Sequence, residues 1–374
     1  MLKDSPWLHP VQPEVFEKNF YNIAGVNMER TIREEMEENE EKILSPYACL
    51  SKKSRGRLRP EPECDVRVAF QRDRDRIIYS KSFRRLKYKT QVFLAPTGDH
   101  YRTRLTHVFE VSQIARTVAV ALKLNGHLTE AIALGHDLGH TPFGHAGESV
   151  LNELHPGGFH HYEQSLRVVD VLENDGNGLN LNFEVRDGIS MHSKGRNEIL
   201  PQDISELPMT MEGRVVRVAD IIAYVNHDVD DALRAGIIKE GQLPIHIYEK
   251  LGKTNSERIN TMVKDLIYTT LAEGGARLTM SPEIMDAISE VRTFLYKNVY
   301  ETSKIHDDFI KAMKVVKELY QYFLEKGVPD KQGGTKPQMI GDHRTVCDFV
   351  AGMTDRYALG LYQNIYLPKP WSVM

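Results

Sequence analysis

Apolar residues recur at intervals of three and four along residues 103–123, and this spacing constrains the fold more than any other pattern in the chain. The recurring residues are Val108, Val111, Ile114, Ala115, Val118, Ala119 and Leu122. On an α-helix they share one face, so the segment predicts an amphipathic helix packed on a hydrophobic core. Helical spacing predicts further helices at residues 28–44, 66–89, 129–137, 163–173 and 215–233.

Strand-like alternation is rare, and it is clearest at Leu179–Val185. We therefore expect an all-α fold, with Leu179–Val185 as the place for one small β-hairpin. Three regions are expected: an N-terminal arm with a basic loop at 1–64, a catalytic core at 65–232, and a C-terminal helical region at 233–374 that completes the pocket and a subunit interface. The Gly- and Pro-containing basic loop Ser51–Pro62 is expected to be mobile.

The composition is typical of a globular protein, with 374 residues of which 41% are hydrophobic and 27% charged. No apolar run approaches the roughly eighteen residues of a membrane-spanning helix, and residues 1–13 lack the apolar stretch of a secretory signal. The three cysteines are scattered, which argues against a disulfide framework and a zinc ribbon. We therefore expect a cytoplasmic protein without a membrane partner. The net charge of −4 does not indicate a general nucleic-acid surface.

Residues 136–148 concentrate metal ligands and proton donors within thirteen positions. His136 and Asp137 are adjacent, and they are followed by His140, His145 and Glu148. Imidazole beside carboxylate suits a divalent metal ion that activates water. Neighbouring residues on a helix point about 100° apart, so both His136 and Asp137 can reach one ion only near a helix end.

Further ligands must come from other helices, and His107 and Asp220 are the best candidates. His107 begins the strongest amphipathic helix, and Asp220 lies in an apolar stretch where an unpaired carboxylate would be costly. Two imidazoles and two carboxylates leave coordination positions for water or phosphate, as in catalytic sites. This donor set favours one divalent ion, Mn²⁺ or Mg²⁺, with Fe, Co, Ni or Zn as alternatives.

The set His107, His136–Asp137 and Asp220 resembles the H…HD…D signature of the HD-domain phosphohydrolases. The flanking segments resemble one branch of that superfamily, the deoxyguanosine triphosphate triphosphohydrolases. These segments are YSKSFRRLKYKTQVF at 79–93, RTRLTHVFEV at 102–111, EAIALGHDLGHTPFGHAGE at 130–148, HHYEQSLRVV at 160–169 and ADIIAYVNHDVDD at 219–231. The resemblance covers roughly residues 65–232, with a further match in MTDRYALGLY at 353–362.

The resemblance implies hydrolysis of a deoxynucleoside triphosphate to deoxynucleoside and tripolyphosphate, by water attack on the α-phosphorus. It implies that His145 is the general acid and that Glu148 holds it or relays its proton. His140 and His161 are similar to further active-site histidines that donate to phosphate oxygens or relay protons. The alternative interpretation of His140 and His161 is that they are supporting or surface histidines.

The resemblance also implies four substrate contacts. Arg104 would bind phosphate, although it could alternatively be a surface cation. Asp228 would accept from the 3′-hydroxyl, Tyr224 would disfavour a 2′-hydroxyl, and Gln91 would add a sugar contact. Asp228 and Tyr224 lie eight and four residues beyond Asp220, which places the three on one helix face.

A strongly basic segment, Arg67–Lys89, contains nine Lys or Arg and two acidic residues. It is either a solvated amphipathic helix or a surface where Arg84, Arg85, Lys87 or Lys89 meets a polyphosphate or a regulatory nucleotide. In the resembled family a regulatory deoxynucleotide or single-stranded DNA is a partner of some members. The family also implies a homo-oligomer with an even number of subunits, a hexamer being one form.

Two alternatives remain open from the sequence. The first is an HD phosphohydrolase that acts on another nucleotide, such as a monophosphate, an alarmone or a cyclic dinucleotide. The second is a non-catalytic oligomer that binds nucleotide or single-stranded DNA. Arg104, Tyr224 and Asp228 argue against the first, and a proton donor at His145 argues against the second.

Overall fold

The computed structural model describes residues 30–91, 102–193, 198–329 and 340–368. These residues form helices and no sheet, which confirms the predicted all-α fold. Their β-type contacts include two isolated bridges, Arg57 with Asn182 and Thr90 with Thr103. The expected hairpin at Leu179–Val185 is wrong, because the segment turns into helix α9 (Phe183–Met191) after Asn182. Its alternation arises from a loop that buries Leu181 followed by a helical turn that buries Val185.

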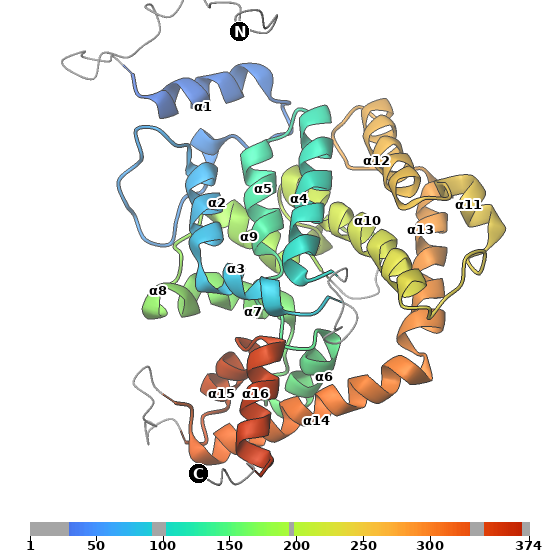
Figure 1. The fold of residues 1–374 in the computed structure, drawn as a ribbon. Coiled ribbons are helices and arrows are strands. Elements are labelled where there is room, and N and C mark those ends of the chain that lie inside the picture. Colours follow the sequence, from blue (N-terminus) through green and yellow to red (C-terminus); the bar gives the residue numbers. More distant parts are fainter. Residues whose placement is uncertain (1–29, 92–101, 194–197, 330–339, 369–374) are drawn as a thin grey trace, which may run out of the picture.

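A first hydrophobic core lies among five helices in the centre of the molecule (Figure 1). These helices are α2 (Ala69–Tyr79), α4 (Arg104–Ala121), α5 (Gly126–Gly135), α9 and α10 (Met211–Arg234). Helix α5 packs on both α2 and α4, and α4 packs along α10. Leu128, Ile132 and Leu134 of α5 are almost fully buried, which stabilises the fold by about 1.5–3 kcal/mol for each side chain.

The predicted helices at 66–89 and 163–173 are interrupted. Helix α2 ends at Tyr79 because Ser80 caps a new helix, α3 (Lys81–Arg85), by accepting from the Phe83 N–H at 3.1 Å. A short 3₁₀ turn, Leu86–Tyr88, follows it. The second segment divides into α7 (His161–Arg167), a π-helical turn at Val168–Leu172, and α8 (Glu173–Gly176). At the N-terminal side, α1 (Ile32–Ile43) begins with a capping box between Thr31 and Glu34.

The C-terminal helices extend the first core and build a second one. Helices α12 (Asn255–Ala272) and α13 (Pro282–Leu295) pack beside α10, and α11 (Ile245–Leu251) packs on α12 and α13. The long α14 (Ser303–Lys326) leads away from them (Figure 1). The second core joins α14 to α15 (His343–Ala351), α16 (Asp355–Tyr366) and α6 (His145–Leu154). Helix α6 follows the His136–Asp137 pair in sequence and packs on α14 and α15, so the C-terminal helices adjoin the predicted site.

The basic loop Ser51–Pro62 is held in place, contrary to the expected mobility. Arg57 is nearly buried, pairs with the carboxylate of Asp73 and lies 2.9 Å from Glu61. The main-chain N–H of Arg59 donates to the Asn180 side chain at 3.0 Å. Asp73 and Asn180 lie outside the loop, which is why its local composition could not reveal these contacts. Across the described residues, no helix combines the length and apolarity needed to cross a membrane.

Candidate metal centre

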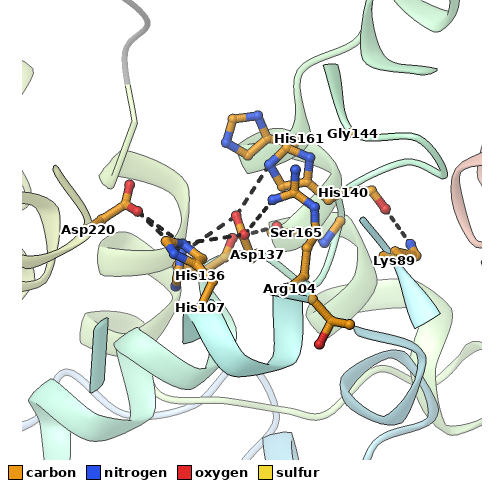
Figure 2. Close-up of polar contacts among 12 residues, drawn as sticks. Lys89, Arg104, His107, His136, Asp137, His140, Gly144, His161, Ser165 and Asp220 are labelled. Atoms are coloured by element: carbon orange, nitrogen blue, oxygen red, sulfur yellow. Dashed lines mark hydrogen bonds and ion pairs between the residues drawn. The ribbon is translucent and has the colours of Figure 1, made fainter. Parts of the chain in front are cut away.

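Three helices bring the four predicted metal ligands together (Figure 2). His107 lies one turn into α4, His136 and Asp137 follow the end of α5, and Asp220 lies in the middle of α10. His107 Nε2 is 3.1 Å from Asp220 Oδ1, and His136 Nε2 is 3.6 Å from Asp137 Oδ1 and 4.0 Å from Asp220 Oδ1. Because α5 ends at Gly135, the backbone turns and the adjacent His136 and Asp137 can both face one point.

The protonation of the imidazoles fits a divalent ion. His136 Nδ1 donates to the Ala133 carbonyl at 2.7 Å, which leaves a lone pair on Nε2. That Nε2 is buried and has no hydrogen-bond partner among the described residues. His107 Nδ1 lies 2.9 Å from His227 Nε2, an arrangement that turns His107 Nε2 toward the carboxylates. An unpaired buried nitrogen beside two carboxylates is the environment of a metal ligand.

Both carboxylates are held in the charged form. Burial alone would raise the pKa of Asp137, but His140, His136 and Arg104 outweigh it and keep this pKa well below its ordinary value. Arg104 Nη1 lies 2.7 Å from Asp137 Oδ2. Burial would likewise raise the pKa of Asp220, but His107 and His136 outweigh it and lower this pKa to about 2. Two permanent carboxylates can therefore bind a cation across the neutral pH range.

A second set of side chains lies on the Arg104 side of Asp137. His140 Nε2 is 3.3 Å from Asp137 Oδ1, and its ring stacks on His161 with centroids 4.1 Å apart. His161 Nδ1 lies 2.8 Å from Glu148 Oε1. Burial would lower the pKa of His161, but Glu148 raises it above its ordinary value. His161 and Glu148 thus form a half-buried ion pair close to the candidate metal ligands.

His145 is the most exposed of the predicted site residues. It opens α6, its side chain is 78% exposed, and its Nδ1 lies 3.4 Å from Glu148 Oε2. The rings of His145 and His140 are 6.2 Å apart. His145 therefore lies at the rim of the site, and Glu148 contacts both His145 and His161.

His192 belongs to the site and was missed by the sequence reasoning. It follows α9, is buried, and its Nδ1 donates to the Ile189 carbonyl at 2.7 Å. Its ring lies 4.9 Å from the His136 ring, and its Nε2 is 3.3 Å from His161 Nε2. Ligand atoms of His136, His192 and Asp220 lie within 4.8 Å of one another. A single histidine at a helix end has no periodic sequence pattern, so its proximity to His136 and His161 is seen only in the structure.

The predicted sugar-binding residues lie further along α10. Asp228 is buried and accepts a short hydrogen bond from the Tyr300 hydroxyl, and its other oxygen is 2.6 Å from His227 Nδ1. Tyr224 is half-buried one turn before Asp228, and burial raises its pKa to about 12. His227 and Tyr300 were not predicted. His227 also contacts the candidate metal ligand His107, so a continuous line of side chains joins the candidate metal centre to Asp228.

Arg104 and Gln91 lie near the loop that precedes α6. A Cβ added at Gly144 would be 3.3 Å from Arg104 Nη2 and 3.6 Å from the Gln91 carbonyl, so the backbone approaches both closely. Lys89 is buried, and its ammonium donates to the His140 carbonyl (Figure 2). It also donates to the Ala351 carbonyl at 3.0 Å. The expectation that Lys89 meets a polyphosphate is therefore wrong, because both of its contacts are internal. The other candidates, Arg84, Arg85 and Lys87, are exposed.

A helical core that gathers a His, a His–Asp pair and a distant Asp defines an HD-domain phosphohydrolase, and residues 104–225 match the HD domain. Residues 278–364 match the phosphohydrolase-associated domain. The deoxyguanosinetriphosphate triphosphohydrolase-like protein of Desulfatibacillum aliphaticivorans is 54% identical over 348 residues, which are 91% of this chain and 99% of the relative. The protein of the same name from Caldanaerobacter subterraneus subsp. tengcongensis is 54% identical over 341 residues, 91% of this chain and 97% of the relative. The chain belongs to this deoxyguanosinetriphosphate triphosphohydrolase-like family.

Proposed function

We propose that this protein hydrolyses deoxynucleoside triphosphates to deoxynucleoside and tripolyphosphate. The observation that carries the proposal is the buried His136 Nε2, unpaired among the described residues and facing Asp137 and Asp220 in a chain of this family. His107, His136, Asp137 and Asp220 would hold the divalent ion. When bound, the ion supplies a water of lowered pKa as nucleophile. The proposed ion is Mn²⁺ or Mg²⁺, the ions that suit this mixed donor set.

Arg104 is the side chain best placed to bind a phosphate. Its Nη1 is bonded to Asp137, while its Nε is buried without a hydrogen-bond partner in the described part of the chain. A buried guanidinium with an unused donor can bind a phosphate oxygen without first losing its hydration. Arg104 would thereby fix the α-phosphate beside the two carboxylates.

Proton transfer in the proposed reaction would use the residues linked by Glu148. As the water oxygen bonds to phosphorus, the bond from phosphorus to the 5′-oxygen breaks and that oxygen needs a proton. His145 at the rim would donate it, and Glu148 would orient the ring. His161, whose pKa is raised by its contact with Glu148, would stabilise the phosphate charge. Acid–base assistance of this kind contributes about 10²–10⁴-fold in rate.

Selection of the sugar would fall to α10 and to the residues that cover it. Asp228 would accept from the 3′-hydroxyl, with the Tyr300 hydroxyl as its present donor. Tyr224 would lie against the ribose and exclude a 2′-hydroxyl, and Gln91 would add a contact. The Gln91 Oε1 atom is buried and has no partner among the residues that the structure describes, which leaves it available to a ligand.

The test is incubation of the purified protein with each deoxynucleoside triphosphate, singly and mixed, in Mg²⁺ or Mn²⁺, followed by anion-exchange separation of products. Deoxynucleoside with intact tripolyphosphate is the expected result. Stepwise release of diphosphate and monophosphate would exclude attack at the α-phosphorus. The absence of turnover in every mixture would reject the proposal and favour another nucleotide substrate or a binding function.

A further inference from the structure

A carboxylate of the C-terminal helices reaches the loop between the His–Asp pair and α6. Asp355 is the first residue of α16 and is 4% exposed. Its Oδ1 accepts from the Phe143 N–H at 2.9 Å. Its Oδ2 accepts from the Thr90 N–H at 2.9 Å and from the Thr90 hydroxyl. One buried side chain therefore ties two segments of the site to each other and to α16.

Lys89 adds a second link between the same three parts. Its ammonium donates to the His140 carbonyl and, at 3.0 Å, to the Ala351 carbonyl at the end of α15. The Lys89 carbonyl accepts from the Arg104 N–H at 3.0 Å, which places this residue against the start of α4. Residues 89 and 90 are thus enclosed between the HD core and the C-terminal helices.

The loop that Asp355 holds has an unfavourable backbone. Phe143 has φ of 60° and Gly144 has φ of 56°, and the left-handed region is costly for a residue with a side chain. Such a conformation persists only where its surroundings fix it. Two features fix it here: the Phe143 N–H bonds to Asp355, and the Phe143 ring is buried in the second core. His140 precedes this turn and His145 follows it.

We propose that Asp355 is a positioning residue that holds the loop His140–His145 in its reactive geometry, so that the phosphohydrolase-associated region sets the place of the proton donor. The proposal rests on the proposed function for its kinetic consequence. Its structural content, the fixed loop, is independent of the substrate. The role assigned to Asp355 is to act through His140 and His145, without touching the substrate.

The donors around Asp355 explain why a carboxylate is required. Among the described residues, the hydrogen-bond partners of both oxygens are N–H and O–H groups, those of Phe143 and Thr90. In Asp355→Asn one oxygen becomes an NH₂ group, which must face a main-chain N–H in either orientation of the amide. An unpaired buried donor costs about 1–3 kcal/mol. The loop can relieve that cost by leaving its strained conformation.

Glu173 offers a matched control. It is buried and accepts from the main-chain N–H groups of Lys81 and Ser82, at 3.1 and 2.7 Å, and from the Ser82 hydroxyl at 2.6 Å. Its donors are therefore of the same kind as those of Asp355, but they belong to α3. Glu173→Gln introduces the same chemical defect without touching the His140–His145 loop.

Hydrogen–deuterium exchange of the loop and steady-state kinetics, both on the full-length metal-loaded protein, test the proposal. In Asp355→Asn we expect faster exchange in residues 138–147, kcat lower by about 10²-fold, KM within threefold, and unchanged metal content. Glu173→Gln should match wild type in loop exchange and kcat. Thr90→Val, which deletes one of the three bonds, should lie between wild type and Asp355→Asn, and it replaces that variant if Asp355→Asn does not fold.

Unchanged loop exchange in Asp355→Asn would overturn the proposal, as would an equal loss of kcat in Glu173→Gln. A rise in KM with kcat unchanged would also overturn it, because it would place Asp355 in substrate binding. If the wild-type protein releases no tripolyphosphate, the proposed function fails. The exchange comparison still decides whether Asp355 holds the loop.

Discussion

His136 is fully buried and its Nε2 has no bonding partner among the described residues, so its replacement should affect the metal ion more than the fold. For His136→Gln we expect loss of bound metal, measured by mass spectrometry of the dialysed protein. We also expect activity to fall by at least about 10²-fold, with the far-ultraviolet circular dichroism of wild type. His155→Gln is the control, since His155 is half-buried and contacts Arg344 away from the site. Retention of full metal content in His136→Gln would contradict the assignment.

Glu212 is a buried carboxyl group whose effect on stability depends on pH. It accepts from the N–H groups of Cys49 and Asn125 at 3.0 and 2.9 Å, and burial raises its pKa to about 7. Because folding raises the pKa of this carboxyl group, the native state binds its proton more tightly than the unfolded state does. The contribution of Glu212 to the free energy of unfolding is therefore complete below the unfolded pKa and is lost as the pH rises toward 7. Glu212→Gln removes this dependence. The free energy of unfolding of Glu212→Gln, measured relative to that of wild type, should therefore increase by on the order of 2–3 kcal/mol between pH 4.5 and 8.

Urea denaturation of wild type and Glu212→Gln at several pH values measures that difference. Glu240→Gln is a suitable control, because the Glu240 side chain is exposed. A gap between Glu212→Gln and wild type that stays constant from pH 4.5 to 8 would show that Glu212 titrates normally.

The four candidate metal ligands could be picked out from the sequence because each has an unusual local context. His107 and Asp220 stood in apolar helical stretches, and His136–Asp137 was an adjacent pair. His192 has no such local context, and Lys89 is one of many Lys and Arg residues in the basic segment Arg67–Lys89. The partners of Lys89 are two carbonyl groups from distant segments, and carbonyl groups have no sequence signature.

Helix α10 places one residue in each turn toward the site, at Asp220, Tyr224 and Asp228. If Tyr224 excludes the 2′-hydroxyl, Tyr224→Ala should lower the ratio of kcat/KM for deoxynucleoside over ribonucleoside triphosphates by about 10-fold or more. Competition between the two substrates in one reaction measures this ratio. Tyr268→Ala, at an exposed tyrosine of α12, should leave it unchanged. An unchanged ratio in Tyr224→Ala would contradict this role of Tyr224, and Tyr300, which contacts Asp228, would be the next residue to test.

Element boundaries were predicted where a local signal existed and missed where tertiary contacts decided. The apolar spacing at 103–123 matches α4 closely. The division after Tyr79 depends on Ser80 acting as a cap, a role that many serines do not play. Leu179–Val185 alternates like a strand, yet no neighbouring strand exists in the described chain to pair with it, and Asn182 instead forms an isolated antiparallel bridge with Arg57.

At the scale of the whole molecule, the candidate metal centre joins three of the helices that enclose the first core. Its candidate ligands come from α4, the end of α5 and α10. An ion that binds only the native state stabilises it by about 2.7 kcal/mol at a concentration hundredfold above its Kd. Removal of metal with a chelator should therefore lower the Tm of the wild-type protein by several degrees, and added Mn²⁺ should restore it.

His136→Gln should unfold at the same temperature with and without chelator, because it has no ion to lose. Scanning calorimetry of both proteins measures the effect, and a chelator-independent Tm in wild type would show that the centre contributes nothing to the cohesion of the helices.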